Sequence, residues 1–183
     1  PKGVGALYVR KGVRLEPLVH GGRQEGGLRA GTENVAAIVG LGQAAELALG
    51  AVREGERIAR LRDLLERGVR ERIPGALLNG HREQRLPNTL NLTLPGLRGE
   101  SLVVALDRCG VSLSSGSACK AGSPDPTHVL LAMGADPASA RGSLRLSLGH
   151  TSTESDVDAV LAVLPAAVER ARQAALASSG GRA

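Results

Sequence analysis

The chain contains almost no aromatic side chains, and this limits how it can build a core. Its 183 residues include one Tyr, no Phe and no Trp. Aromatic residues supply much of the buried surface of most cores, so this interior must be made from Leu, Val, Ile and Ala. Hydrophobic residues still make up 42% of the chain, an ordinary share for a globular protein. The length suits one domain, or one domain and a part of another.

Helical spacing of apolar residues recurs along the chain. It begins just after Thr32, which occupies the position expected of an N-cap. It returns over residues 54–71 and, more briefly, over residues 99–109. A capping-box pattern at Thr151-x-x-Glu154 predicts the start of a last helix. We expect Pro165 to break or kink that helix.

Several short segments have the character of strands. Residues 89–94 alternate strictly between polar and apolar types, as do residues 144–148, and the second alternation places Arg145 on a polar face. Residues 5–9 form a short apolar stretch that suits a strand. Residues 114–126 are rich in Ser, Gly and Pro and predict a loop.

The charge and the cysteine content narrow the class of protein. The net charge is +5, but basic and acidic residues are interleaved and a single aromatic residue offers almost nothing to stack on bases, so we expect no nucleic-acid partner. Two cysteines are too few for a disulfide framework, which favours a reducing, cytoplasmic compartment. No apolar run looks long enough to span a membrane, and we expect no membrane partner.

The two cysteines lie in different surroundings. Cys119 follows a Ser/Gly run in the predicted loop, where a thiol is accessible enough to act as a nucleophile. Cys109 lies three residues after Leu106 and seven after Leu102, so helical spacing places it on an apolar face as inert packing. The spacing of both cysteines and His128 matches none of the paired spacings of zinc sites, and no metal site is expected.

Thr32 and Arg145 can each be interpreted either as a functional residue or as a residue with only a structural or solvent-exposed role. Thr32, after Gly31, could bind an anion at a helix N-terminus, or it could be a simple N-cap. Arg145 could pair with a carboxylate through both arms of its guanidinium, or it could lie on a solvated strand face. The residues alone leave both alternatives open.

Several motifs in order along the chain are more specific together than any one of them. They are Pro1-Lys2-Gly3, Gly5-Ala6-Leu7-Tyr8-Val9, His20-Gly21-Gly22, Gln24-Glu25, Arg29-Ala30-Gly31-Thr32-Glu33-Asn34, Leu86-Pro87-Asn88-Thr89-Leu90-Asn91, Gly99-Glu100-Ser101-Leu102, Ser114-Ser115-Gly116-Ser117-Ala118-Cys119, Pro126-Thr127-His128-Val129-Leu130 and Ser143-Leu144-Arg145-Leu146-Ser147-Leu148-Gly149. With them, the chain resembles the C-terminal part of the cysteine desulfurases, pyridoxal-phosphate (PLP) enzymes of the class V aminotransferase fold. The resemblance implies an α/β fold of the PLP-dependent aminotransferase type. Residues 1–50 would be the remnant of a large PLP-binding domain, residues 51–177 a small α+β domain, and residues 178–183 a disordered tail.

The resemblance also implies roles for three residues. Cys119 would attack the sulfur of PLP-bound L-cysteine and become a persulfide, leaving L-alanine. Arg145 would hold the substrate carboxylate, and Thr32 would contact the PLP phosphate across a homodimer interface. The sulfur would pass to an acceptor or Fe–S scaffold protein, for Fe–S clusters or thio-modified RNA.

The resemblance places the Schiff-base lysine shortly before the Pro-Lys-Gly turn, at which this chain starts. We therefore expect that lysine upstream of Pro1, and Lys2 belongs to the turn itself. The chain alone would then be an inactive fragment of an active enzyme. Two alternatives remain: another class V PLP enzyme, such as a selenocysteine lyase, and a non-catalytic fragment that carries sulfur or binds a partner.

Overall fold

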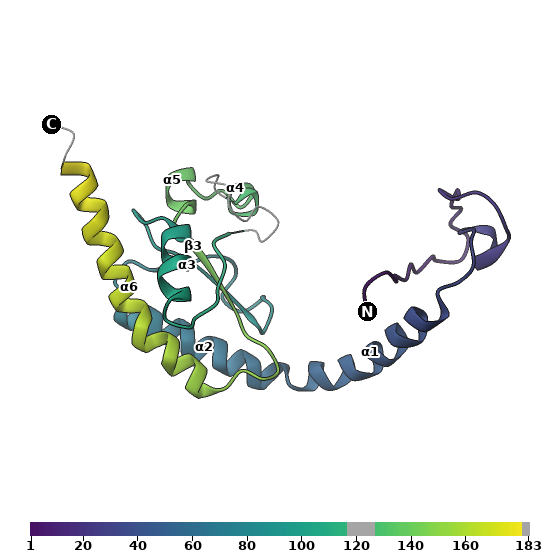
Figure 1. Cartoon of the computed structure of the whole chain (residues 1–183), viewed down its shortest axis with the longest axis horizontal. Helices are drawn as coiled ribbons and strands as arrows, with labels where there is room; N and C mark the ends of the chain where they lie inside the picture. Colours follow the sequence, from purple (N-terminus) through teal and green to yellow (C-terminus); the bar gives the residue numbers. More distant parts are fainter. Residues whose placement is uncertain (117–126, 181–183) are drawn as a thin grey trace. The chain divides into compact units, whose positions relative to one another are not determined.

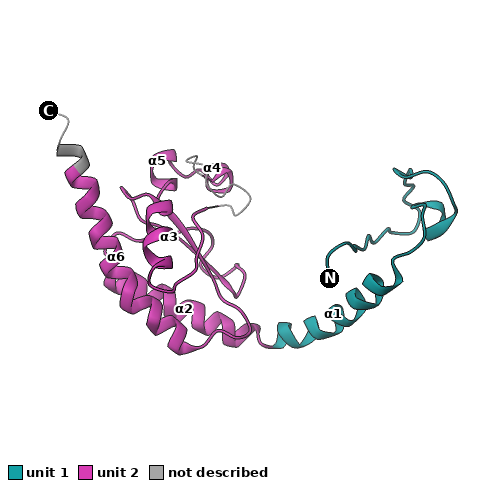
Figure 2. Ribbon diagram, viewed as in Figure 1, with its two compact units in different colours: residues 1–53 teal, residues 54–183 magenta. Residues whose placement is uncertain are grey.

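Figure 1 shows the computed structural model of the chain, which describes residues 1–116 and 127–180, the last three by their backbone only. The chain divides into two units, Pro1–Arg53 and Glu54–Ala183, coloured separately in Figure 2. We call them unit 1 and unit 2 and describe each by itself.

Unit 1 contains the 3-10 helix η1 (Gln24–Gly27) and the helix α1 (Val35–Arg53). The strand predicted over residues 5–9 is not formed, because a strand needs a hydrogen-bonded neighbour and no segment within residues 1–53 pairs with it. The prediction that Thr32 caps the helix is also wrong. Asn34 precedes α1, and its side-chain oxygen accepts a first-turn backbone N–H at 3.2 Å.

Helix α1 leaves its apolar residues exposed. None of its residues is buried, and within residues 1–53 Ala30 is the only buried hydrophobic residue. Contrary to the sequence prediction, α1 is long and apolar enough to cross a membrane. The core helix of a soluble protein can be equally long and apolar, so packing against protein explains the length and composition of α1 equally well.

Unit 2 is built on a three-stranded antiparallel sheet. The strands β1 (Leu77–Leu78), β2 (Thr89–Thr93) and β3 (Ser143–Ser147) lie in the order β1-β2-β3, with β2 in the centre. Both segments predicted from strict alternation are therefore confirmed as strands. Their register pairs Asn91 with Arg145 and Leu92 with Leu144.

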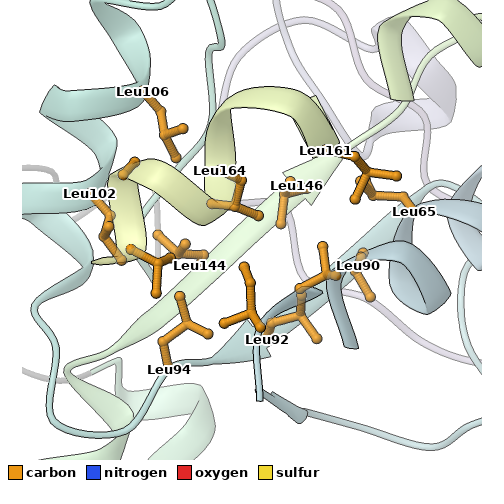
Figure 3. Close-up of a cluster of buried hydrophobic side chains, with 14 of the residues drawn as sticks. Leu65, Leu90, Leu92, Leu94, Leu102, Leu106, Leu144, Leu146, Leu161 and Leu164 are labelled. Carbon is orange, nitrogen blue, oxygen red and sulfur yellow. The ribbon is translucent and has the colours of Figure 1, made fainter. Parts of the chain in front are cut away.

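Three helices of unit 2 cover one face of this sheet: α2 (Gly55–Arg72), α3 (Gly99–Asp107) and α6 (Glu154–Gly180). Figure 3 shows the leucines of β2 and β3 gathered with those of the helices in one cluster. Its fully buried members include Leu90, Leu102 and Leu106. The core is aliphatic, as the lack of aromatic residues requires. Two short helices, α4 (His128–Ala132) and α5 (Pro137–Ala140), precede β3.

The start of α6 differs from the predicted capping box. The reciprocal hydrogen bonds form between Thr153 and Asp156, not between Thr151 and Glu154. The Thr153 N–H donates to the Asp156 carboxylate at 2.8 Å, and the Asp156 N–H donates to the Thr153 hydroxyl oxygen at 3.3 Å. This is the same kind of cap, two residues further along the chain.

Helix α6 is continuous through Pro165, which the sequence analysis predicts as a break or kink. Proline removes one backbone donor, but its neighbours Leu164 and Ala167 are each only 1% exposed. Packing of this apolar face outweighs the missing hydrogen bond. The helix reaches Gly180 and so enters the segment 178–183 that the sequence analysis predicts as a disordered tail.

Candidate functional site

A hollow of about 240 Å³ lies on the face of the sheet opposite the helical core. Its sheet wall carries the polar side chains of Asn79, Asn91 and Arg145, which alternate with leucines directed into the core. An apolar wall comes from α4 and the residue after it, through Val129 and Met133. Pockets for drug-sized ligands span roughly 300–1,000 Å³, so this hollow suits a small molecule.

Arg145 supplies the positive charge of the hollow. Its neighbours Leu144 and Leu146 are buried in the core, which directs the half-buried Arg145 side chain to the other face. Within residues 1–116 and 127–180 no carboxylate forms an ion pair with it, and its one side-chain hydrogen bond is a long one of 3.5 Å to the Ser114 hydroxyl. Most of its guanidinium donors thus have no acceptor among the described residues, and a carboxylate matches the geometry of such donors.

The segment that contains Cys119 starts and ends at this hollow. Ser114 is bridged to Arg145 by two backbone hydrogen bonds, of 3.2 and 2.7 Å. Gly116 and Thr127 both line the hollow, and a Cβ built on Gly116 would lie 3.3 Å from the Thr127 Cβ. Cys119 itself lies outside the described residues. The structure thus brings the two ends of its segment next to Arg145.

Two asparagines form a part of the site that the sequence analysis missed. Asn91 is the register partner of Arg145 on β2. Asn79, just after β1, donates from Nδ2 to Asn91 Oδ1 at 2.7 Å and to the Thr93 hydroxyl at 2.8 Å. Alternation placed Asn91 on a polar face, but only the register shows that it faces Arg145.

Arginines of unit 2 hold the connection between β1 and β2 against α2. Arg62 donates to the carbonyl of Leu86 at 2.6 Å. Arg85, within the connection, donates to Glu66 at 2.5 Å and to Asp63 at 3.1 Å. These contacts fix the part of the connection that leads into β2.

Thr32 lies in unit 1 and is exposed. Its hydroxyl forms no hydrogen bond within the described residues, while the N–H of the preceding Gly31 donates to Gln24 Oε1 at 3.2 Å. Since α1 begins only at Val35, Thr32 does not present the first turn of a helix to an anion. Its free hydroxyl still fits one hydrogen bond to a phosphate oxygen.

Cys109 is not buried, contrary to the sequence prediction. Helix α3 ends at Asp107, so the helical spacing used to place Cys109 no longer applies at that position. The exposed thiol lies 3.6 Å from the carbonyl oxygen of Ala105 and follows the helix in a turn closed by Gly110, whose φ is +78°. Cys109 does not line the hollow of Arg145.

Comparisons with known proteins agree with the resemblance. The family model for class V aminotransferases matches residues 1–160. The IscS-like cysteine desulfurase of Mycobacterium tuberculosis is 52% identical over 182 residues, which are 98% of this chain and 46% of that protein. The chain thus spans about half the length of the curated relatives it matches.

Solved structures show the same similarity. A NifS-like protein superposes with a TM-score of 0.75 at 38% identity, over 88% of this chain and 41% of that one. A structure described as SspA in complex with cysteine superposes with a TM-score of 0.55 at 35% identity, over 81% of this chain and 40% of that one.

Proposed function

The chain belongs to the class V aminotransferase family, and from this premise we propose that the whole protein containing it is a PLP-dependent cysteine desulfurase. In the overall reaction the C–S bond of L-cysteine breaks and the carbon takes up a proton to give L-alanine. The sulfur forms an S–S bond to Cys119, whose thiol becomes a persulfide. The relatives named cysteine desulfurase, one of them 52% identical, support this assignment.

The proposal rests on the position of Arg145 and on its lack of an acidic partner among the described residues. Its guanidinium lies at a small hollow, is held on β3 between two neighbouring segments, and has no acidic partner among the described residues. A cation held in this way suits the α-carboxylate of a small amino acid. The apolar side of the hollow, at Val129 and Met133, suits the rest of such a ligand.

Cys119 is proposed as the sulfur acceptor of this reaction. It follows Gly116 by three residues, and three residues of chain span at most about 11 Å. Gly116 lines the hollow. Chain length therefore allows the thiol to reach a ligand bound at Arg145, and no comparable argument applies to Cys109.

PLP, when bound, would supply the electron sink for breaking the C–S bond. We propose that the free hydroxyl of Thr32 contacts its phosphate, across the interface of a homodimer. None of the three lysines of the chain, Lys2, Lys11 and Lys120, occupies the position of the Schiff-base lysine in the family motif, so we propose that the rest of the protein supplies that lysine. The exposed apolar residues of α1 support residues 1–50 as part of a larger PLP-binding domain.

The partners follow from the same proposal. They are L-cysteine, a second copy of the protein, and a sulfur-acceptor or Fe–S scaffold protein. We propose a cytoplasmic location, because two sparse cysteines suit a reducing compartment. Neither nucleic acid nor a membrane has a part in the proposed reaction.

Labelled sulfur tests the proposal directly. The whole protein with PLP and ³⁵S-cysteine should release L-alanine and retain the label on protein. Cys119→Ser should abolish the label, while Cys109→Ser, the matched control, should keep it. Label that survives in the Cys119 variant and disappears in the Cys109 variant would contradict the assignment. Turnover of selenocysteine but not cysteine would identify a selenocysteine lyase instead.

Substitution of Arg145 tests the substrate site. Arg145→Ala should raise KM for cysteine about ten- to a hundredfold, since it removes a charge-assisted pair worth roughly 1.5–3 kcal/mol. Arg145→Lys should rescue only part of this, because a single ammonium cannot reproduce the two parallel hydrogen bonds of a guanidinium. An unchanged KM in the alanine variant would show that Arg145 does not bind substrate.

A further inference from the structure

Asn91 occupies an unusual position for an asparagine. It lies in β2, the central strand of the sheet, and asparagine is depleted in strands. Its neighbours Leu90 and Leu92 are 0% and 2% exposed in the core, so its own side chain lies on the opposite face. There it lines the hollow beside its register partner Arg145.

Asn79 determines how the amide of Asn91 is oriented. The Asn79 Nδ2 group donates to the Asn91 oxygen, so that oxygen already has a partner. The second N–H of Asn79 goes to the Thr93 hydroxyl, which also lies 3.3 Å from Asn79 Oδ1. Flipping the Asn91 amide alone would place its Nδ2 group against the Nδ2 group of Asn79, so that two donors would face each other. The Asn91 Nδ2 group is thus left with two donors, for which the described residues supply no acceptor.

The charge of the hollow indicates which ligand these donors suit. Arg145 is the only charged residue among the described residues that line it. The amide N–H groups of Asn91 add neutral donors on the adjacent strand. A guanidinium and an amide donor side by side favour an anionic group with several acceptor lone pairs, and a carboxylate is such a group.

We propose that Asn91 is a substrate-positioning and specificity-determining residue, which donates a hydrogen bond from Nδ2 to the carboxylate bound by Arg145. This inference rests on the proposed function for the identity of the substrate. Arg145 supplies the charge, and Asn91 selects ligands that carry a carboxylate next to it. Asn79 is a positioning residue that acts through Asn91.

Asn91→Asp is the sharpest substitution, because aspartate has nearly the same shape. One of its oxygens can still accept from Asn79, while the other replaces the donor with a negative charge opposite Arg145. That charge pairs with the guanidinium and repels a ligand carboxylate. Asn91→Ala removes the donor without adding charge. Asn88→Asp is the matched control, since it adds the same charge at an exposed position that does not line the hollow.

The experiment uses the whole PLP-loaded protein and two kinds of measurement. The first is KM and kcat for L-cysteine. The second is the dissociation constant of L-alanine, compared with that of ethylamine, which is alanine without its carboxylate. Loss of one hydrogen bond to a charged group weakens binding about ten- to a hundredfold. We expect this loss for L-cysteine and L-alanine with Asn91→Ala, and a larger one with Asn91→Asp. Ethylamine binding and the values for Asn88→Asp should stay within about threefold of the wild type.

The outcomes separate this inference from the proposed function. If the wild-type protein forms L-alanine from cysteine but the Asn91 variants keep the wild-type KM and L-alanine affinity, the role of Asn91 is refuted and the desulfurase proposal stands. Equal weakening of L-alanine and ethylamine would also refute it, because a general loss of structure does not distinguish the carboxylate. A wild-type protein that forms no L-alanine would refute the proposed function and, with it, the substrate assigned to Asn91.

Discussion

Replacing Gly142 with alanine should destabilise unit 2 far more than one added methyl group suggests. Gly142 lies directly before β3 and is buried. A Cβ built on it would overlap the carbonyl oxygen of Leu94 and would lie 3.0 Å from the Leu94 carbonyl carbon and 3.2 Å from the carbonyl oxygen of Leu97. All three are backbone atoms, so no rotation of a side chain can relieve the overlap.

The expected loss of stability can be derived from the backbone segments that must separate to make room for the added Cβ. Relief of the overlap separates the two chain segments, which breaks the hydrogen bond from Leu94 N–H to the Gly142 carbonyl at 3.0 Å and strains the one from Gly99 N–H to the Arg141 carbonyl at 2.9 Å. Each is worth about 1 kcal/mol net, and overpacking of a close contact adds about 1–3 kcal/mol. We expect a loss of roughly 3–5 kcal/mol in the free energy of unfolding.

Gly149→Ala is the matched control. Gly149 follows β3, is exposed, and has no atom within 4 Å of the added Cβ, so its substitution should change stability by less than about 0.5 kcal/mol. Urea unfolding followed by far-UV circular dichroism suits the comparison, because the only aromatic residue, Tyr8, lies in unit 1. Equal urea midpoints for the two variants would refute the close approach at Gly142.

Two further predictions concern the core and the cap of α6. Leu102→Ala should cost about 2–5 kcal/mol, since Leu102 is 0% exposed, whereas Val104→Ala on the same helix should cost far less because Val104 is 55% exposed; urea midpoints check both. Hydrogen bonds from the Thr153 N–H and hydroxyl hold the pKa of Asp156 below its ordinary value of 3.8. These hydrogen bonds should stabilise the folded protein fully above pH 3.8, and the stabilisation should be lost as the pH falls through the lowered folded-state pKa of Asp156. Asp156→Asn should therefore flatten the pH dependence of stability in this acidic range and leave a wild-type-like slope elsewhere. A wild-type slope in the Asn variant, or an NMR titration of Asp156 at its ordinary value, would contradict this.

The main strands and helices of unit 2 could be predicted from the sequence because each of them buries one face in the core. The alternation of residues 89–94 and 144–148 and the helical period of residues 54–71 reflect which side chains reach the core. Burial also explains why Arg145 could be singled out, as a charged residue between two core leucines. The family resemblance was carried by the motifs, and the family match over residues 1–160 confirmed it.

The failed predictions have two causes: some depended on contacts distant in sequence, and others on the exact ends of helices. Residues 5–9 have strand character but no partner within unit 1. Cys109 follows the last turn of α3, and periodicity does not show where a helix ends. Thr32 and Asn34 are both good N-cap residues, so residue type alone could not choose between them. Asn91 was missed because pairing it with Arg145 requires the register of the sheet.

The sheet also explains how Arg145 can be both rigid and available. The residues on either side of it in β3 are fixed in the aliphatic core, and its backbone is bridged to Ser114 while its register partner on β2 is Asn91. The helices α2, α3 and α6 contribute to the core on the other face, whereas α4 and the two ends of the Cys119 segment lie at the hollow beside Arg145. In the proposed reaction, Arg145 holds a carboxylate and needs a fixed side chain, whereas Cys119 must meet first a substrate and then a second protein. A strand position for Arg145, with the two ends of the Cys119 segment held beside it, would suit both of these proposed roles.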